Sequence, residues 1–281
     1  MRYTQICTTV LAIIGTASAA YMDDLVTSLP DMANFTDFRL FSGYLSVRGT
    51  GKYLHYMFAE SQQNPSTDPL LIWFNGGPGC SSMLGYLQEH GPYVMEDETK
   101  VFHKNDYSWN KQANMVYIES PAGVGFSYCD DMKLCQDFND ENSADDNLDA
   151  LLSFFQKFTE YRHHDLYITG ESYAGIYVPF LAYRIDTYNQ NATKIPGTFQ
   201  FNLKGFVVGN GVTNWQWDGD QAYTEMAFYN GLYGTELLQQ IKDNKCDFFY
   251  EDCYPEDTPE SFTLQSQSSI WSPSWICLNW R

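Results

Sequence analysis

The sequence predicts an α/β fold with a mostly parallel central sheet flanked by helices. Short apolar runs that end abruptly in glycine or polar residues are typical of strands buried on both faces, and four occur, at residues 70–74, 115–118, 166–168 and 203–208. Apolar residues recur at helical spacing in two further segments, residues 143–158 and 173–188. Buried strands that alternate with helices form a parallel sheet covered on both faces.

Two strands are expected ahead of these runs. Residues 41–47 and 53–59 are rich in apolar and aromatic side chains and are joined by Arg48-Gly49-Thr50-Gly51-Lys52, a glycine-rich turn typical of a β-hairpin. In the first helical segment we expect Ser143 to be the N-cap, with Asp146 three residues later.

Residues 1–20 have the features of a secretory signal peptide. Arg2 precedes an apolar stretch that ends in Ala17-Ser18-Ala19-Ala20, a small-residue cleavage signature. A buried N-terminal strand or helix is the alternative. No later stretch reaches the roughly 18 consecutive apolar residues of a membrane span, so we expect no membrane association after cleavage. A main domain over residues 21–255 and an unassigned tail over residues 256–281, rich in Ser and Trp, would follow.

The secretory interpretation gives meaning to two short motifs. Asn34-Phe35-Thr36 and Asn191-Ala192-Thr193 are acceptors for N-linked glycosylation in a protein that passes through this pathway. The final compartment, whether extracellular space, vacuole or lysosome, stays open at this point.

Composition narrows the class of partner. The 281 residues have 44% hydrophobic content, which is ample for one large core, and a formal net charge of −19. Such an acidic chain repels phosphate groups, which argues against nucleic acid or an anionic membrane as the partner.

Six cysteines follow the leader, and an even set in a secreted chain favours disulfides over metal sites. We expect the two short-range pairs, Cys129 with Cys135 and Cys246 with Cys253. No C-x-x-C pair suggests zinc, and we expect neither a metal nor a cofactor.

The segment Gly170-Glu171-Ser172-Tyr173-Ala174-Gly175 has the pattern of a nucleophile elbow. A tight strand-to-helix turn lifts the serine hydroxyl clear of the sheet and offers backbone N–H groups to a developing oxyanion. Gly170 and Ala174 supply the small flanks that the turn needs, although the common form has glycine in place of Ala174. The alternative is that Ser172 caps the helix that starts near Tyr173.

A glycine-rich loop follows the first buried run. Asn75-Gly76-Gly77-Pro78-Gly79 lets backbone N–H groups approach a ligand closely, as the second half of an oxyanion hole requires. An ordinary glycine turn is the alternative. Ligands of such sheets bind beyond the carboxyl ends of the strands. Asn75, Glu119 and Ser172 all follow the carboxyl ends of predicted strands, so we expect them to lie together at one edge of the sheet.

Three segments resemble the signature segments of the serine carboxypeptidase family, in the same order: residues 73–82, 119–128 and 170–175. The resemblance covers roughly residues 24–250. It implies an α/β-hydrolase fold and removal of single residues from peptide or protein C-termini through an acyl-enzyme. Ser172 would be the nucleophile, and the backbone N–H groups of Gly77 and Tyr173 would bind the oxyanion.

The resemblance also implies a site for the free carboxylate of the substrate. Asn75 and Glu171 would bind it, Trp73 would support them, and Glu89 would be a second carboxyl that shares a proton with Glu171. Two like charges in one site raise a pKa, so a protonated carboxyl can donate to the substrate carboxylate, and binding should weaken as pH rises. For Glu89, a solvated surface position is the alternative.

Other residues fit the pattern less well. Ser127, in Gly125-Phe126-Ser127, is a rival nucleophile but follows a loop, and we expect it to be structural. Hydrolases of this fold place Asp and His after the serine, yet all five histidines precede Ser172. His163 and His164 stand at the far end of the elbow strand, where we expect exposed loop residues.

Because no catalytic Asp or His can be assigned, we expect the chain to hold the first half of the hydrolase and the start of its helical lid, incomplete at the C-terminus. Cys80 would then lack its usual partner, leaving Cys277 to replace it. Three functions follow from the sequence: a serine carboxypeptidase active at acid pH, a secreted peptide-binding homologue without a triad, and a related acyltransferase. The oligomeric state and the preferred C-terminal residue are not predicted.

Overall fold

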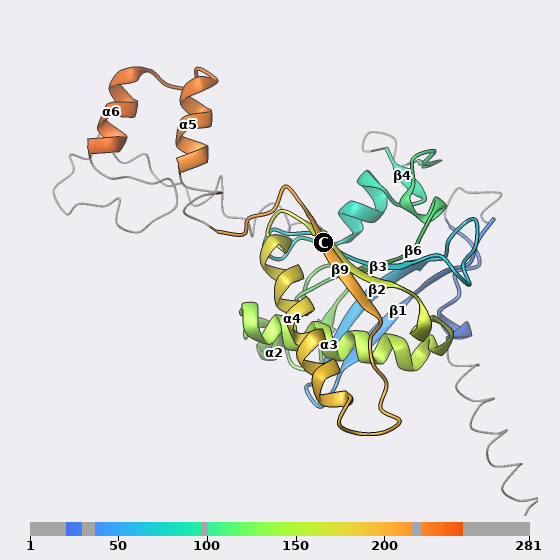
Figure 1. Cartoon of the computed structure of the whole chain (residues 1–281). Coiled ribbons are helices and arrows are strands. Elements are labelled where there is room, and N and C mark those ends of the chain that lie inside the picture. The colour runs from blue at the N-terminus through green and yellow to red at the C-terminus, as the bar shows by residue number, and fades with distance from the viewer. Residues whose placement is uncertain (1–20, 30–36, 97–100, 215–217, 219–220, 244–281) are drawn as a thin grey trace, which may run out of the picture.

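The computed structural model describes residues 21–29, 37–96, 101–214, 218 and 221–243. Its centre is a seven-stranded sheet in the order β1–β2–β6–β3–β8–β9, with β7 paired to β2 (Figure 1). The strands are β1 (Leu40–Val47), β2 (Lys52–Ala59), β3 (Leu70–Phe74), β6 (Asn114–Ile118), β7 (Tyr128–Cys129), β8 (Leu166–Glu171) and β9 (Leu203–Gly209). A separate small sheet pairs β4 (Tyr93–Met95) with β5 (Phe102–Lys104).

The helices are α2 (Met132–Gln136), α3 (Asp140–Lys157), α4 (Ala174–Ala192), α5 (Gln221–Tyr229) and α6 (Thr235–Asp243). The described residues also contain four short helical turns: η1 (Met22–Asp24), η2 (Gly85–Glu89), η3 (Trp109–Lys111) and η4 (Thr159–His163). None of the helices in the described part of the chain combines the length and apolarity that a membrane span requires.

The predicted α/β architecture is confirmed, and the sheet is mixed. β3, β6, β8 and β9 run parallel, whereas the β1–β2 hairpin adds two antiparallel strands beside β6. The carboxyl ends of β3, β6 and β8 therefore lie at one edge. This arrangement brings Asn75, Glu119 and Ser172 to the same side of the sheet.

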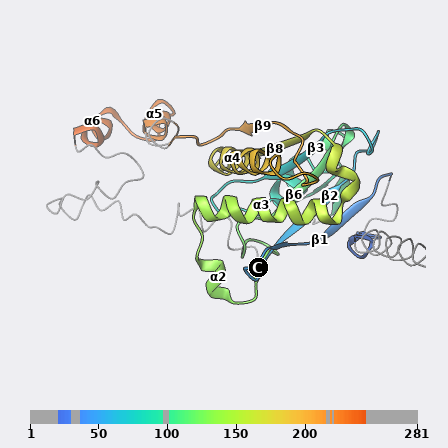
Figure 2. The ribbon, with the colours of Figure 1, turned by 60° about the horizontal axis from the view of Figure 1, so that its bottom comes forward.

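Aromatic side chains fill the core on both faces of the sheet. On one face α3 and α4 pack against each other and against the strands (Figure 2). Phe58 of β2 contacts Phe154 of α3 and Phe158, the C-cap residue of that helix, with ring centroids 5.4 and 5.1 Å away. On the other face Trp73 and Tyr117 pack with Tyr86 of η2 in a second buried cluster.

One helix begins earlier than we expected. The N-cap of α3 is Asn139, whose Oδ1 accepts from the Asn142 N–H at 2.9 Å, while Asn142 Oδ1 accepts from the Asn139 N–H at 2.7 Å. This reciprocal capping box starts the helix one turn before Ser143, so the prediction of Ser143 as the cap was wrong. Ser143 is buried inside the helix.

The predicted disulfide between Cys129 and Cys135 is confirmed, with Cα atoms 5.9 Å apart. Cys80 is disulfide-bonded as well. Several expectations lie outside the described residues: the signal peptide at 1–20, the glycosylation acceptor Asn34, the Cys246–Cys253 pair, Cys277 and the tail at 256–281.

Candidate active site

Ser172 occupies a strained turn between β8 and α4. Its φ is +61°, in the left-handed region that side-chain-bearing residues avoid at a cost of about 1–3 kcal/mol. Backbone hydrogen bonds hold it there: its N–H donates to the Gly209 carbonyl at 3.0 Å, and its carbonyl accepts from Gly175 and Val212 N–H groups at 2.9 Å each. This is the backbone geometry of a nucleophile elbow.

Small residues allow the elbow to form. A Cβ atom added to Gly170 would lie 2.5 Å from the Ala174 Cβ and 2.6 Å from the Phe74 carbonyl oxygen. Because real Cβ contacts are longer, only glycine fits between β3 and α4 at this point. The small flanks predicted on each side of Ser172 are thus explained by close packing.

The Ser172 side chain does not act as a helix cap. The N-terminus of α4 has no side-chain cap, and within the described residues the Ser172 hydroxyl makes no hydrogen bond. Ser172 is half-buried, so the hydroxyl can meet a ligand. The capping alternative is therefore wrong.

The glycine-rich loop packs directly against the elbow. A Cβ on Gly76 would lie 2.3 Å from the Tyr173 backbone nitrogen and 2.9 Å from the Ser172 Cβ. Gly77, next in the chain, has a φ of +114°, which favours glycine. Within the described residues its N–H makes no hydrogen bond. The loop backbone at Gly76 thus lies directly against the backbone of Ser172 and Tyr173.

Hydrogen bonds from two neighbouring elements hold the loop. The Gly79 N–H donates to the Tyr177 hydroxyl of α4 at 3.2 Å. The Ser82 hydroxyl accepts from the Asn75 N–H at 3.1 Å and donates to the Ile118 carbonyl of β6 at 2.6 Å. The loop is therefore a fixed part of the site.

A cluster of one amide and two carboxyls begins at Asn75 of the glycine loop. Asn75 is 4% exposed, and its Nδ2 donates to Glu89 Oε1 at 3.0 Å and reaches Glu171 Oε2 at 3.5 Å. Its Oδ1 accepts from Trp73 Nε1 at 2.8 Å and the Gly85 N–H at 2.9 Å, which fixes the amide orientation. The structure brings together all four residues that the resemblance assigns to carboxylate binding.

Glu89 is exposed to solvent and also has a side-chain hydrogen-bond partner in Asn75. Its side chain is 33% exposed and lies at the end of η2, directed to Asn75. Burial raises the pKa of the Glu89 carboxyl above its usual value; the Asn75 amide opposes this change, and the neighbouring Glu171 carboxylate adds to it. Glu89 therefore retains its proton to a higher pH than an isolated glutamate does.

Glu119 is a buried hub beside the glycine loop. It is fully buried, and its carboxylate accepts from the Ser81 hydroxyl, the Phe126 N–H at 2.8 Å and His55 Nδ1 at 2.9 Å. A Cβ on Gly125 would collide with this carboxylate. The sequence placed Glu119 at a strand end but gave no sign of its partners, which come from distant segments.

Replacing Glu119 by glutamine is expected to lower the free energy of unfolding by about 1–3 kcal/mol, because an amide accepts through one oxygen only and leaves a buried donor unpaired. Urea denaturation followed by tryptophan fluorescence measures the change. The exposed Glu160 is the matched control, and Glu160→Gln should change stability by less than about 0.5 kcal/mol. Equal losses of stability at the two positions would contradict the stabilising role of the Glu119 hydrogen bonds.

Ser127, the rival nucleophile, is a structural residue. It is 4% exposed; its hydroxyl donates to the Glu119 carbonyl at 2.7 Å and accepts from the His55 N–H at 2.8 Å. Both functions of the hydroxyl are used in holding β2 to the loop after β6. The expectation of a structural serine agrees with this geometry.

The histidines before the elbow strand differ from the expectation. His163 is exposed, as expected, but His164 is 9% exposed and its Nδ1 lies 2.7 Å from the Asp68 carbonyl oxygen. The prediction of an exposed His164 was therefore wrong, because Tyr161 and the β3 entry cover its ring. Neither histidine contacts Ser172.

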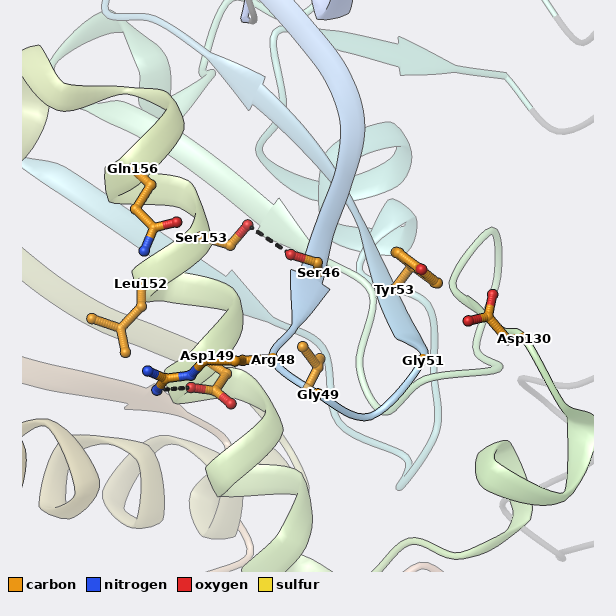
Figure 3. A pocket seen from close by; sticks show the side chains of 11 residues that line it. Ser46, Arg48, Gly49, Gly51, Tyr53, Asp130, Asp149, Leu152, Ser153 and Gln156 are labelled. Carbon is orange, nitrogen blue, oxygen red and sulfur yellow. Dashed lines mark hydrogen bonds and ion pairs between the residues drawn. The ribbon is translucent and has the colours of Figure 1, made fainter. Parts of the chain in front are cut away.

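A cavity of about 470 Å³ lies between the β1–β2 turn, α3 and Asp130 (Figure 3). Its lining includes an Arg48–Asp149 ion pair at 2.8 Å and a contact between the Ser46 and Ser153 hydroxyls at 3.5 Å. None of its lining residues belongs to the elbow, the glycine loop or the carboxyl cluster. Across the described part of the chain, no group of three or more His, Cys, Asp or Glu side chains is placed to hold a metal ion.

Comparison with known proteins gives one consistent family. The family profile described as serine carboxypeptidase matches residues 30–273. The lysosomal protective protein of Mus musculus is 42% identical over 236 residues, which are 82% of this chain and 47% of that protein. Serine carboxypeptidase ctsa-4.1 of Caenorhabditis elegans is 41% identical over 229 residues, 82% of this chain and 46% of that protein.

A solved structure shares the fold. The prohormone-processing carboxypeptidase KEX1(delta)P from Saccharomyces cerevisiae superposes with a TM-score of 0.61 at 24% identity, over 83% of this chain and 56% of that one. The likeness supports the α/β-hydrolase fold. The chain spans about half the length of the curated relatives it matches.

Proposed function

Because this chain belongs to the serine carboxypeptidase family, we propose that it acts on peptides with a free C-terminal carboxylate and that Ser172 forms the acyl-enzyme. The observation that carries the proposal is the position of the Asn75–Glu89–Glu171 cluster beside the glycine loop, which itself packs against the Ser172 elbow. An endopeptidase has no use for such a cluster at this place.

In the proposed hydrolysis of the C-terminal peptide bond, each residue of the site has a separate role. Asn75 Nδ2 and a protonated carboxyl of the Glu89–Glu171 pair bind the terminal carboxylate and set the scissile carbonyl over Ser172. The Ser172 Oγ bonds to the carbonyl carbon, and its proton passes through a general base to the leaving amino acid as the C–N bond breaks. The Gly77 and Tyr173 N–H groups bind the oxyanion. Water then hydrolyses the ester.

A second candidate is a peptide-binding homologue. It is favoured by the lack of contact between Ser172 and any histidine of the described part, while the carboxylate cluster is complete. The two functions separate in one experiment: the peptidase loses turnover on Ser172 replacement, and both functions lose peptide affinity when Asn75 is changed.

Asn75→Asp is expected to raise the Kd for an N-blocked dipeptide by about 10-fold to 100-fold, which corresponds to one charge-assisted hydrogen bond. Aspartate keeps the acceptor for Trp73 Nε1 and Gly85 but removes the Nδ2 donor and adds a negative charge. Isothermal titration calorimetry measures the affinity. The same peptide with a C-terminal amide is the control, and its weaker binding should not change. If both peptides lost affinity equally, the C-terminal carboxylate of the substrate would not bind at Asn75.

The affinity for a free C-terminal carboxylate is expected to fall as pH rises. Burial and Glu171 raise the pKa of Glu89, so the bridging proton is present at acid pH and is lost above that pKa. Loss of one required proton lowers affinity by about tenfold per pH unit beyond the midpoint. Titrations across a pH series test this, and affinity that is constant or rises with pH would oppose the shared-proton mechanism.

Family membership also suggests how the protein is processed and where it is located. Its curated members include a lysosomal protein, which is consistent with a secretory route. We propose that residues 1–20 are a cleaved signal peptide and that Asn34 and Asn191 carry glycans. Asn191 is exposed in the last turn of α4. Mass spectrometry of the secreted product before and after deglycosylation tests all three assignments.

A further inference from the structure

His90 directly follows Glu89 and is held by aromatic residues. It is 7% exposed. Its ring stacks on Trp109, with centroids 4.2 Å apart and planes 18° apart, and meets Trp73 edge-on at 4.2 Å. Its Nδ1 lies 3.0 Å from the Tyr117 hydroxyl. Since Trp73 also holds the Asn75 amide, the imidazole touches the carboxylate-binding site from behind.

These contacts favour one tautomer of His90. Tyr117 is fully buried, and in the described part of the chain its hydroxyl bonds to His90 Nδ1 alone. The hydroxyl satisfies its donor when Nδ1 accepts, and on this ground we assign the ring proton to Nε2. Burial lowers the pKa of His90 to about 4, which keeps the ring neutral in weak acid.

The Nε2–H has no hydrogen-bond partner among the described residues, although the atom is buried. Glu89 Oε2 lies 3.9 Å from it. That distance is too long for a hydrogen bond, but a small rotation of the Glu89 side chain closes it. A buried unpaired donor costs about 1–3 kcal/mol, which favours such a movement when Glu89 is ionised.

We propose that His90 is a positioning residue for carboxylate recognition: its Nε2–H draws in the ionised Glu89 carboxylate and so sets the pH above which the site releases a peptide carboxylate. The proposal rests on the proposed function for its peptide readout. Without the Nε2–H the ionised form of Glu89 is less stable, so the pair keeps its proton to higher pH, and peptide binding persists there.

The other groups around Glu89 do not supply this control. Glu171 on β8 is the charged residue that faces it, through Asn75, and acts in the opposite direction. Tyr117 on β6 and Tyr86 within η2 are buried phenols whose pKa values burial raises, so both stay neutral. Burial likewise raises the pKa of Tyr93 on β4. Asn75 Nδ2 donates to the Glu89 carboxylate, and His90 Nε2 lies 3.9 Å from it.

Two isosteric substitutions separate this role from packing. Glutamine places its amide nitrogen near the position of Nε2, so His90→Gln keeps a donor toward Glu89. Asparagine reaches only as far as Nδ1, so His90→Asn keeps a group for Tyr117 but removes the donor. If His90 served packing alone, both variants would behave alike, or Asn would be the milder change.

The first readout is the pKa of Glu89 in the purified protein, from carboxyl ¹³C shifts assigned with Glu89→Gln. The second is the pH midpoint of binding of an N-blocked dipeptide. His90→Asn is expected to raise the Glu89 pKa and the pH midpoint of binding by about 1 pH unit each, equivalent to a tenfold change in proton affinity. His90→Gln should leave both values near those of the parent protein. Thermal unfolding checks that both variants fold.

The outcomes are distinct. If Asn and Gln give the same Glu89 pKa, or Asn lowers it, the role of His90 is refuted. If the parent protein binds no peptide at any pH but the pKa difference appears, the proposed function fails and the role of His90 in holding Glu89 stands. If peptide binds and neither readout moves in His90→Asn, the proposed function stands and the inference fails.

Discussion

Ser172→Ala is expected to abolish hydrolysis of an N-blocked dipeptide, lowering kcat by about 10⁴-fold or more, because removal of the nucleophile leaves only oxyanion and binding contributions. Peptide affinity should be unchanged, since the hydroxyl makes no hydrogen bond within the described residues and alanine keeps the Cβ. Release of the C-terminal amino acid at about pH 5 is followed by chromatography, and affinity by calorimetry.

Ser127→Ala is the matched comparison for this test. Ser127 follows the same Gly-x-Ser spacing, but its hydroxyl is consumed by the His55 N–H and the Glu119 carbonyl. Its loss should cost about 1–3 kcal/mol of stability and spare the bond-forming step. Activity that survives in Ser172→Ala and disappears in Ser127→Ala would transfer the nucleophile to Ser127. A parent chain that binds peptide without turnover would support the binding-protein candidate.

Gly76→Ala is expected to reduce kcat by about 10²-fold to 10³-fold, the usual effect of losing an oxyanion donor. The added methyl would lie 2.3 Å from the Tyr173 nitrogen and 2.7 Å from the Glu171 carbonyl oxygen, both of them backbone atoms. The loop must therefore move off the elbow, which separates the N–H groups of Gly77 and Tyr173. We also expect a loss of about 1–3 kcal/mol in stability from overpacking.

Gly205→Ala in β9 is the control for this substitution. Nothing lies within 4 Å of a Cβ at Gly205, so alanine fits there. Activity should be retained, and stability should change by no more than about 1 kcal/mol, with alanine favoured over glycine in a strand. Full activity in Gly76→Ala would mean that the loop does not form the oxyanion site.

The turn that holds Ser172 was predictable because its signals are local. The run over residues 166–168 specifies a buried strand, and Gly170 and Ala174 permit the turn that the structure shows at Ser172. The hairpin of β1 and β2 was predictable for the same reason, because alternating strands and a glycine turn are contiguous in the chain. Where two local signals competed, as at the start of α3, the stronger capping box at Asn139 prevailed over Ser143.

By itself the sequence determined the family and the positions of β1, β2, β3, β6, β8 and β9, since each depends on a short contiguous pattern, but it did not predict β4, β5 or β7. Only the tertiary structure decided that Glu119 joins Ser81 to His55 and that His90 lies against Trp73 with its Nε2 near Glu89. These side chains come from segments far apart in the chain or from irregular turns without periodicity. Their environment is set by burial and by partners that a linear pattern does not encode, which is why their protonation and roles emerge from packing.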